Sequence, residues 1–343
     1  MKSVILDIKY KITKPTIPIA IGTCPYSTLL TLIKTVINYI FMKKLLKTLC
    51  LLTILFSTTL NFAQEIGVQK NLIETESYNL YKPDTTDAVL LLFGGYPEDA
   101  AVIENEFPIT DLANDENVAV AYLNYNRKLW LEEEEKALLA VSLQELFTNN
   151  NFPTDKIYFG GLSSGGNMAL LIGDFLAKNP QYNIEPNGVF IVDSPLDLSE
   201  LYRSAELNVE RNFSESAIQE SAWIIQTFNE KFGNPNENIK PYEPYSVFTF
   251  ETKNFKNLKD LENTKLRFYT EPDKVWWKEN MGADYENMNA FHIKRLSEFL
   301  TNNNFNIEYI PTQNKGFNAN GDRNPHSWSI VDKEELLQWM LEE

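Results

Sequence analysis

One serine flanked by glycines is the residue of this sequence best suited to covalent chemistry. Ser163 lies in the stretch Gly161-Leu-Ser-Ser-Gly165, after the apolar run Ile157–Phe159 and before an apolar helical run. A G-x-S-x-G spacing between strand and helix predicts a sharp turn that holds the serine hydroxyl at the tip of the strand. The neighbouring Ser164 fits less well, because Leu162 stands where such a turn needs a small residue. We therefore predict that Ser163 is a nucleophile.

A serine hydroxyl becomes a good nucleophile only when a base takes its proton. The sequence offers two histidines. His292 lies in a helical run beside lysine and arginine, and we expect it on the surface of a helix. His326 lies in the stretch Gly321–Trp328, a loop between the last expected strand and the last expected helix. Because a histidine is expected downstream of such a turn, we predict His326 as the base.

The base needs an acid to orient it, and three carboxylates are candidates. Asp273 is our first choice, because it follows the expected strand Leu266–Tyr269 with enough chain to curl back toward His326. Glu271, two residues earlier, is the alternative acid. Asp193, at the end of an earlier strand, is the third candidate.

Acyl transfer also requires hydrogen-bond donors for the oxyanion that develops on the carbonyl oxygen. The backbone N–H of Ser164 is one expected donor, because that residue follows the nucleophile. The loop Phe93-Gly-Gly-Tyr-Pro-Glu98 is expected to supply the other from the N–H of Tyr96. Glycines at the start of this loop allow its backbone to approach the nucleophile.

These residues must be positioned by strands that alternate with helices. From residue 88 onward, apolar runs between turn residues predict six strands: Ala88–Phe93, Val118–Leu123, Ile157–Phe159, Gly188–Val192, Leu266–Tyr269 and Ile307–Ile310. A hairpin is expected over residues 66–82. Such a pattern predicts an α/β fold with a mostly parallel sheet of about eight strands and helices on both faces. The polar and aromatic segment 199–262 interrupts the alternation and is expected to be a helical cap insertion.

From about residue 88 to its end, the chain resembles the α/β-hydrolase superfamily. The loop Phe93–Glu98 is similar to the oxyanion loop of that family, usually written His-Gly-x-Pro-Glu or His-Gly-Gly-Gly, although no histidine begins it here. The stretch Gly161–Gly165 matches the family's turn at the nucleophile, Asp273 its acid and His326 its base. The resemblance implies an α/β-hydrolase fold with a Ser-His-Asp triad and no cofactor or metal, and it leaves the substrate open.

Charge and cysteine content exclude several classes of function for the body of the chain. The 343 residues carry a formal net charge of −16. Residues 1–63 hold eight lysines and one acidic residue, so residues 64–343 carry a net charge of −23. So acidic a body does not predict a nucleic acid partner. Both cysteines, Cys24 and Cys50, precede residue 64, which excludes disulfides and cysteine chemistry from the body.

The first 63 residues have the layout of a targeting segment. Met42 and three nearby lysines precede an apolar run, Leu49–Phe56, and a small residue follows at Ala63. This pattern predicts a signal peptide over residues 42–63, cleavage after Ala63 and export to the periplasm or the extracellular space. Residues 1–41 are then expected to be a misassigned start or an N-terminal extension. An uncleaved membrane anchor over about residues 28–60 is the alternative, so contact with a membrane is expected only through this segment.

The resulting prediction is an exported carboxylic ester hydrolase that acts through an acyl-enzyme on a small-molecule, glycan or peptide ester. A serine peptidase with the same machinery and a non-catalytic binding protein are the alternatives. Trp276, Trp277 and Trp328 are expected to line the pocket or to pack between cap and core. In the pocket they would suit an aromatic acyl group or a sugar.

Overall fold

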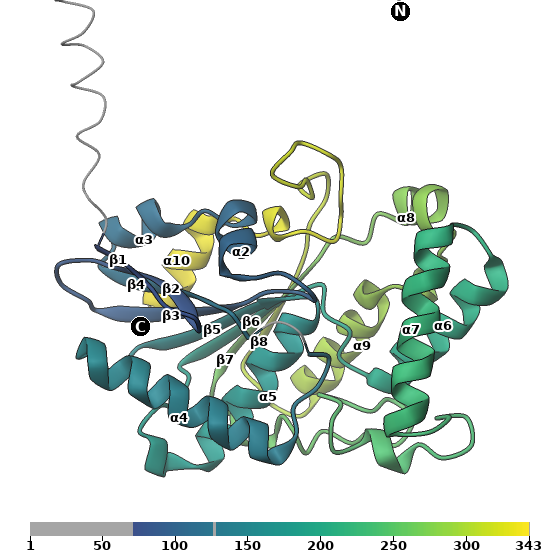
Figure 1. Cartoon of the computed structure of the whole chain (residues 1–343), viewed down its shortest axis with the longest axis horizontal. Helices are drawn as coiled ribbons and strands as arrows, with labels where there is room; N and C mark the ends of the chain where they lie inside the picture. Colours follow the sequence, from purple (N-terminus) through teal and green to yellow (C-terminus); the bar gives the residue numbers. More distant parts are fainter. Residues whose placement is uncertain (1–70, 126–127, 343) are drawn as a thin grey trace, which may run out of the picture. The chain divides into compact units, whose positions relative to one another are not determined.

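The computed structural model describes residues 71–125 and 128–342, and its strands form one sheet in the order β1-β2-β4-β3-β5-β6-β7-β8 (Figure 1). The strands are β1 (Asn71–Glu74), β2 (Tyr78–Lys82), β3 (Ala88–Phe93), β4 (Val118–Leu123), β5 (Ile157–Leu162), β6 (Gly188–Val192), β7 (Lys265–Thr270) and β8 (Ile307–Pro311). β1 and β2 form an antiparallel hairpin, and β2 pairs antiparallel with β4. All pairs from β4 to β8 are parallel. The predicted hairpin, the six further strands and the mostly parallel sheet are confirmed.

Helices follow most of the strands. The α-helices are α2 (Ala100–Glu106), α3 (Thr110–Asp115), α4 (Glu133–Asn150), α5 (Ser164–Lys178), α6 (Leu198–Arg211), α7 (Glu215–Lys231), α8 (Lys274–Met281), α9 (Asn289–Asn302) and α10 (Lys333–Leu341). Short 3₁₀ helices are η1 (Pro180–Tyr182), η2 (Lys240–Tyr242), η3 (Lys259–Leu261), η4 (Tyr285–Asn287) and η5 (Trp328–Ile330). α2 and α3 are separated at Phe107-Pro108, because proline lacks an N–H donor and restricts the residue before it.

The sheet is buried on both faces, as its continuous apolar strands require. Along β3, Val89, Leu91 and Phe93 belong to one apolar core, whereas Leu90 and Leu92 belong to another. The first core is completed by α4, α5 and α9, and the second by α2, α3 and α10. Figure 1 shows these two sets of helices on opposite sides of the sheet. The α/β fold class with helices on both faces is thereby confirmed.

The connection from β6 to β7 holds the two helices α6 and α7, which pack against each other. A small apolar cluster includes Tyr202 of α6, Phe228 of α7 and Tyr242 of η2, and it joins this connection to Leu129 in the segment before α4. In Figure 1, α6 and α7 stand at one end of the sheet, near α8, and cover neither face of it. This location places the long insertion next to the end of the sheet where Ser163 lies.

The targeting segment and the extension predicted over residues 1–63 lie outside the described residues. Within residues 71–125 and 128–342, none of the helices is long and apolar enough to cross a bilayer.

Candidate active site

Ser163 occupies a strained turn between β5 and α5. Its φ of 53° and ψ of −126° place it in a region that L-residues rarely adopt. Strain of this kind costs of order 1–3 kcal/mol and persists only where the surroundings enforce it. Here the surroundings are tight, because a Cβ atom on Gly161 would lie 2.2 Å from the backbone of Gly165. The sharp turn predicted from the glycine spacing is therefore present.

The backbone of the nucleophile candidate is tied to the next strand. The N–H of Ser163 donates a hydrogen bond of 2.9 Å to the carbonyl oxygen of Val192, the last residue of β6. Leu162 and Val192 are register partners, so the residues that follow them, Ser163 and Asp193, leave neighbouring strands side by side. The carboxyl ends of β5 and β6 therefore bring a hydroxyl and a carboxylate to one edge of the sheet.

His326 joins this edge from the loop after β8. Its Nδ1 donates a hydrogen bond to Oδ2 of Asp193 over 2.6 Å. The Asp193 side chain is only 5% exposed and the His326 side chain 29% exposed. A carboxylate at Nδ1 fixes the ring orientation and leaves Nε2 available to accept a proton.

The preference for Asp273 as the orienting acid was wrong, as was the choice of Glu271 as its alternative. Asp273 caps the N-terminus of α8, where it accepts a hydrogen bond from the N–H of Trp276 at 3.0 Å, and its other oxygen pairs with Arg323 at 2.8 Å. Glu271 also pairs with Arg323 and accepts the N–H of Gly316 at 3.1 Å. Both carboxylates thus hold the loop that carries His326 and do not contact its ring.

The charges around His326 favour its protonated form. Burial by itself lowers the pKa of this imidazole. The hydrogen bond and negative charge of Asp193, together with the charges of Glu98 and Glu220, outweigh that effect and raise the pKa above its ordinary value. Glu220 belongs to α7, so the insertion between β6 and β7 lies close enough to His326 to influence its protonation.

The loop Phe93–Glu98 lies against the turn at Ser163, as the proposed oxyanion geometry requires. A Cβ atom on Gly95 would lie 3.1 Å from Cβ of Ser163. The N–H of Tyr96, one of the two expected donors, donates to Oγ of Ser164 at 3.0 Å. The N–H of Ser164, the other expected donor, has no acceptor within α5, because Ser164 is the first residue of that helix. Both N–H groups thus lie close to Ser163, and the N–H of Tyr96 is hydrogen-bonded to the side chain of Ser164.

Glu98 holds this loop in place. Its Oε2 accepts the N–H of Gly95 at 2.8 Å and Nε1 of Trp328 at 3.3 Å. Burial raises the pKa of the Glu98 carboxyl. Phe93, which stands where the resembled family begins its loop with histidine, is fully buried and packs edge-on against Phe159.

Several side chains differ from their expected surroundings. His292 is only 9% exposed and lies between the rings of Phe250 and Phe291, so the prediction of a surface histidine was wrong. Burial lowers its pKa. Trp328 is fully packed in the core, where it stacks on Phe107. By contrast, the ring centroid of Trp277 lies 6.5 Å from that of His326, so this tryptophan does lie beside the site.

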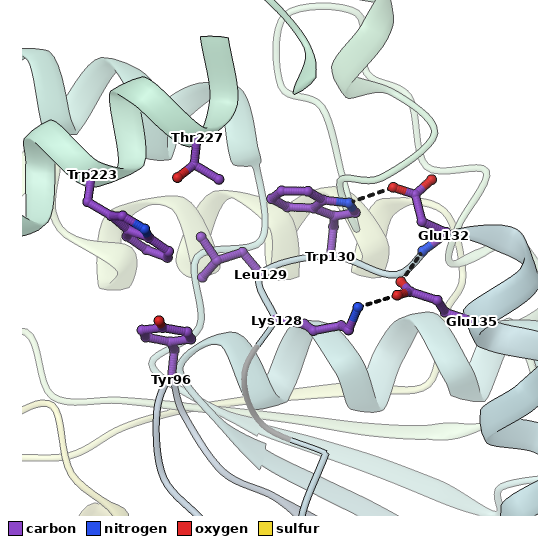
Figure 2. A pocket seen from close by; sticks show the side chains of 8 residues that line it. All are labelled: Tyr96, Lys128, Leu129, Trp130, Glu132, Glu135, Trp223 and Thr227. Atoms are coloured by element: carbon purple, nitrogen blue, oxygen red, sulfur yellow. Dashed lines mark hydrogen bonds and ion pairs between the residues drawn. The ribbon is translucent and has the colours of Figure 1, made fainter. Parts of the chain in front are cut away.

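A second aromatic group, which the sequence analysis did not identify, lines a cavity beside the loop Phe93–Glu98. Figure 2 shows the side chains of this cavity, among them Tyr96, Trp130 and Trp223. Trp223 lies on α7 and its ring stacks on that of Tyr96, with centroids 5.0 Å apart. For Trp223, the only signal in the sequence was the aromatic character of the insertion 199–262.

Within residues 71–125 and 128–342, no cluster of three or more histidine, cysteine or acidic side chains is placed to hold a metal ion. At this edge of the sheet, a histidine is oriented by Asp193, which follows the strand next to the strained Ser163, and backbone N–H donors lie near that serine. This combination suits the attack of an alkoxide on a carbonyl carbon and proton transfer to a leaving group.

Comparisons with known proteins give structural likenesses at low sequence identity. The chain matches no family model and no curated protein. A hormone-sensitive lipase from a metagenome library is 14% identical with a TM-score of 0.48, and the match covers 80% of this chain and 86% of that one. An alpha-beta hydrolase from Vibrio vulnificus is 16% identical with a TM-score of 0.45, covering 82% of each chain. Fluorophosphonate-binding serine hydrolase F from Staphylococcus aureus is 14% identical with a TM-score of 0.46, covering 79% of this chain and 97% of that one.

Proposed function

We propose that this chain, whose fold is the α/β-hydrolase fold, is a serine hydrolase that cleaves carboxylic esters through an acyl-enzyme. The observation that carries the proposal is the 2.6 Å hydrogen bond between His326 and Asp193, formed at the strand end next to the strained Ser163. A loop histidine that served only packing would not need a buried carboxylate at Nδ1. Here the carboxylate leaves Nε2 as the ring nitrogen that can exchange a proton.

In the proposed reaction, Oγ of Ser163 attacks the acyl carbon while its proton passes to Nε2 of His326. The bond between the acyl carbon and the leaving oxygen then breaks, and His326 returns the proton to the departing alcohol. Water attacks the acyl-enzyme with His326 again as the base, which releases the carboxylic acid and restores Ser163. Asp193 orients the imidazole and stabilises its protonated form throughout.

The oxyanion is proposed to receive the N–H groups of Ser164 and Tyr96. The N–H of Tyr96 is bonded to Oγ of Ser164 at 3.0 Å. Rotation of the Ser164 side chain on substrate binding would release this donor. The negative charges of Asp193, Glu98 and Glu220 near His326 are proposed to support the imidazolium that forms in the transition state.

A fluorophosphonate probe tests for an activated serine. We expect the purified body, residues 64–343, to be labelled covalently, and the Ser163→Ala variant not to be labelled. Ser142→Ala is the matched control, because Ser142 is an exposed serine of α4 whose hydroxyl donates to Leu138 within the same helix. Labelling that persists in Ser163→Ala, or a folded protein that is never labelled, would overturn the proposal.

Paired substrates separate an esterase from a peptidase. We expect an ester to be hydrolysed with a higher kcat/KM than the amide that carries the same acyl group. Faster hydrolysis of the amide would instead assign the machinery to peptide bonds. Binding of both compounds without turnover or labelling would identify a non-catalytic binding protein.

We further propose that the chain is exported and that its segment 42–63 is removed as a signal peptide. The support is the basic start at Met42, the apolar run that follows it and the small residue Ala63. N-terminal sequencing of the protein from its native host should find Gln64 first. A first residue at or before Met42 would instead support an uncleaved anchor.

A further inference from the structure

We propose that the cavity between Trp130 and Trp223 receives the acyl group of the substrate, and that this group carries a flat, uncharged ring. The cavity has a volume of about 210 Å³. In Figure 2, the two indoles lie on opposite sides of it, with Leu129 between them and Tyr96 below Trp223. The inference rests on the serine hydrolase function proposed above.

The cavity adjoins the proposed oxyanion site through Tyr96. This residue supplies an aromatic side chain to the cavity and a backbone N–H to the loop beside the nucleophile. The preceding residue, Gly95, lies so near Ser163 that an added Cβ atom would be 3.1 Å from the serine Cβ. A substrate whose carbonyl carbon is held at Ser163 would therefore have its neighbouring groups within reach of this cavity.

The acyl part of the substrate fits this cavity better than the leaving group does. The leaving oxygen must lie near His326, which returns a proton to it. Trp277, the tryptophan beside the His326 ring, lines a separate cavity together with Leu196 and Met288. The described side chains around the Trp223 cavity come from the oxyanion loop, the segment 128–135 and α7, and none comes from the histidine loop.

The walls of the cavity favour a ring. Trp130 is held edge-on against Phe228 and Phe232, so its indole presents a fixed surface. Trp223 and Tyr96 remain 38% and 46% exposed, although they stack on each other. Aromatic side chains arranged in this way stabilise another ring beyond the contribution of its burial. A cavity of about 150 Å³ lined by apolar side chains can hold benzene, so one ring with a short linker is a suitable size.

The charges at the edge of the cavity are already paired. Lys128 forms an ion pair with Glu135. Glu132 accepts a hydrogen bond from Nε1 of Trp130 at 3.0 Å and pairs with Lys231. Among the described residues at this edge, two cations thus balance two carboxylates, and a charged group on the ring would find no unmatched partner among them. A neutral ring avoids the cost of burying an unpaired charge.

Two isomeric esters test whether the enzyme prefers a ring and whether that ring binds on the acyl side of the ester bond. Methyl 3-phenylpropionate carries the ring on the acyl group, whereas 2-phenylethyl acetate carries it on the alcohol. We expect the wild type to hydrolyse the first with a kcat/KM about tenfold or more above that of the second. The same excess is expected over methyl hexanoate, which lacks a ring. Acid release can be followed by titration at constant pH.

Variants of α7 connect this preference to the cavity. Trp223→Ala should lower kcat/KM for methyl 3-phenylpropionate more than that for methyl hexanoate, and should thereby abolish most of the preference for the ring. Trp223→Phe should retain an intermediate preference because it keeps a ring. Gln226→Ala should leave the preference unchanged, because Gln226 lies on the same helix but bonds to Glu230 on the exposed surface.

The outcomes separate this inference from the proposed function. If Ser163 is labelled by fluorophosphonate and methyl hexanoate is hydrolysed, but the ring gives no advantage or Trp223→Ala preserves it, only the cavity assignment is overturned. A preference for 2-phenylethyl acetate would likewise overturn it, because the ring would then bind on the leaving-group side. Absence of labelling would overturn the proposed function and the cavity assignment together.

Discussion

The carboxylate of Asp193 accepts a hydrogen bond of 2.6 Å from Nδ1 of His326, although 133 residues separate the two in the chain. Asp193 directly follows β6, and its N–H bonds to the carbonyl oxygen of Tyr269 in β7 at 2.9 Å. Its position is therefore held by the sheet itself. The histidine depends on a long loop, which Arg323 anchors through Glu271 and Asp273.

The first prediction concerns which carboxylate orients the histidine. Asp193→Asn should lower kcat for ester hydrolysis by about 10³–10⁴-fold, because an amide at this position disfavours the tautomer in which Nδ1 carries the proton. Asp273→Asn should lower kcat by less than about tenfold, since Asp273 only caps α8 and pairs with Arg323. Steady-state kinetics on the two variants decide the question. A larger loss in Asp273→Asn would contradict the assignment of Asp193.

The alternating pattern of apolar runs was sufficient to predict the strands that carry this site. Ser163 could be selected because glycines at fixed spacing have a local structural meaning. His326 could be selected because the only other histidine stands in a helical run. The choice among Asp193, Glu271 and Asp273 could not be made in this way, because it depends on which strands are neighbours.

The order of the strands explains why Asp193, the third candidate, lies nearer the nucleophile than Asp273 does. β6 lies beside β5, whereas β7 lies one strand further from the nucleophile. A carboxylate at the end of β6 therefore leaves the sheet next to the turn that holds Ser163. Arg323 also could not be foreseen as the partner of Asp273, because 50 residues of chain separate them. The Trp223 cavity was missed for the same reason, since it joins segments from three parts of the chain.

The second prediction concerns the pH dependence of catalysis. His326 must be neutral to act as a base, and its raised pKa places the acid limb of the kcat/KM profile above the usual histidine range of about 6.5. Glu220→Gln removes a negative charge that favours the imidazolium, so the limb should move to lower pH. High salt should reduce this difference.

A charge-neutralising control on the same helix completes this test. Glu230 belongs to α7 but accepts a hydrogen bond from Gln226 on the exposed surface. Glu230→Gln should leave the acid limb where it is in the wild type. An unchanged or upward-shifted limb in Glu220→Gln would show that Glu220 does not act on His326 as described.

The third prediction concerns stability and uses a carboxyl group remote from the catalytic residues. Asp174 of α5 is 7% exposed and accepts the N–H of Asp260 at 2.9 Å. Burial and the charge of Asp260 raise its pKa from 3.8 to about 7. The folded state therefore holds a proton that the unfolded state releases above pH 3.8, and stability from this group falls as pH rises from about 4 to 7.

Replacement of this carboxyl should remove the loss of stability. Asp174→Asn keeps an oxygen acceptor for the N–H of Asp260, and it should raise the free energy of unfolding at pH 8 by roughly 1–3 kcal/mol. At pH 4 the two proteins should differ much less. Urea unfolding at both pH values measures the difference, with the exposed Asp155→Asn as a control expected to stay within about 0.5 kcal/mol of the wild type. A destabilised Asp174→Asn at pH 8 would refute the prediction.

The fourth prediction compares the same substitution at two buried glycines near the nucleophile strand. A Cβ atom on Gly160 of β5 would lie 2.2 Å from the ring of Phe190, which is fully buried in β6. Gly160→Ala should therefore lower the free energy of unfolding by roughly 1–3 kcal/mol, because the ring has no free space to move into.

A Cβ atom on Gly173 of α5 would lie 3.4 Å from Val189, an ordinary contact. Gly173→Ala should raise the free energy of unfolding by about 0.5–1 kcal/mol, because alanine favours a helix. Denaturant unfolding of both variants would show opposite shifts, and equal shifts would contradict the close packing of β5 against β6.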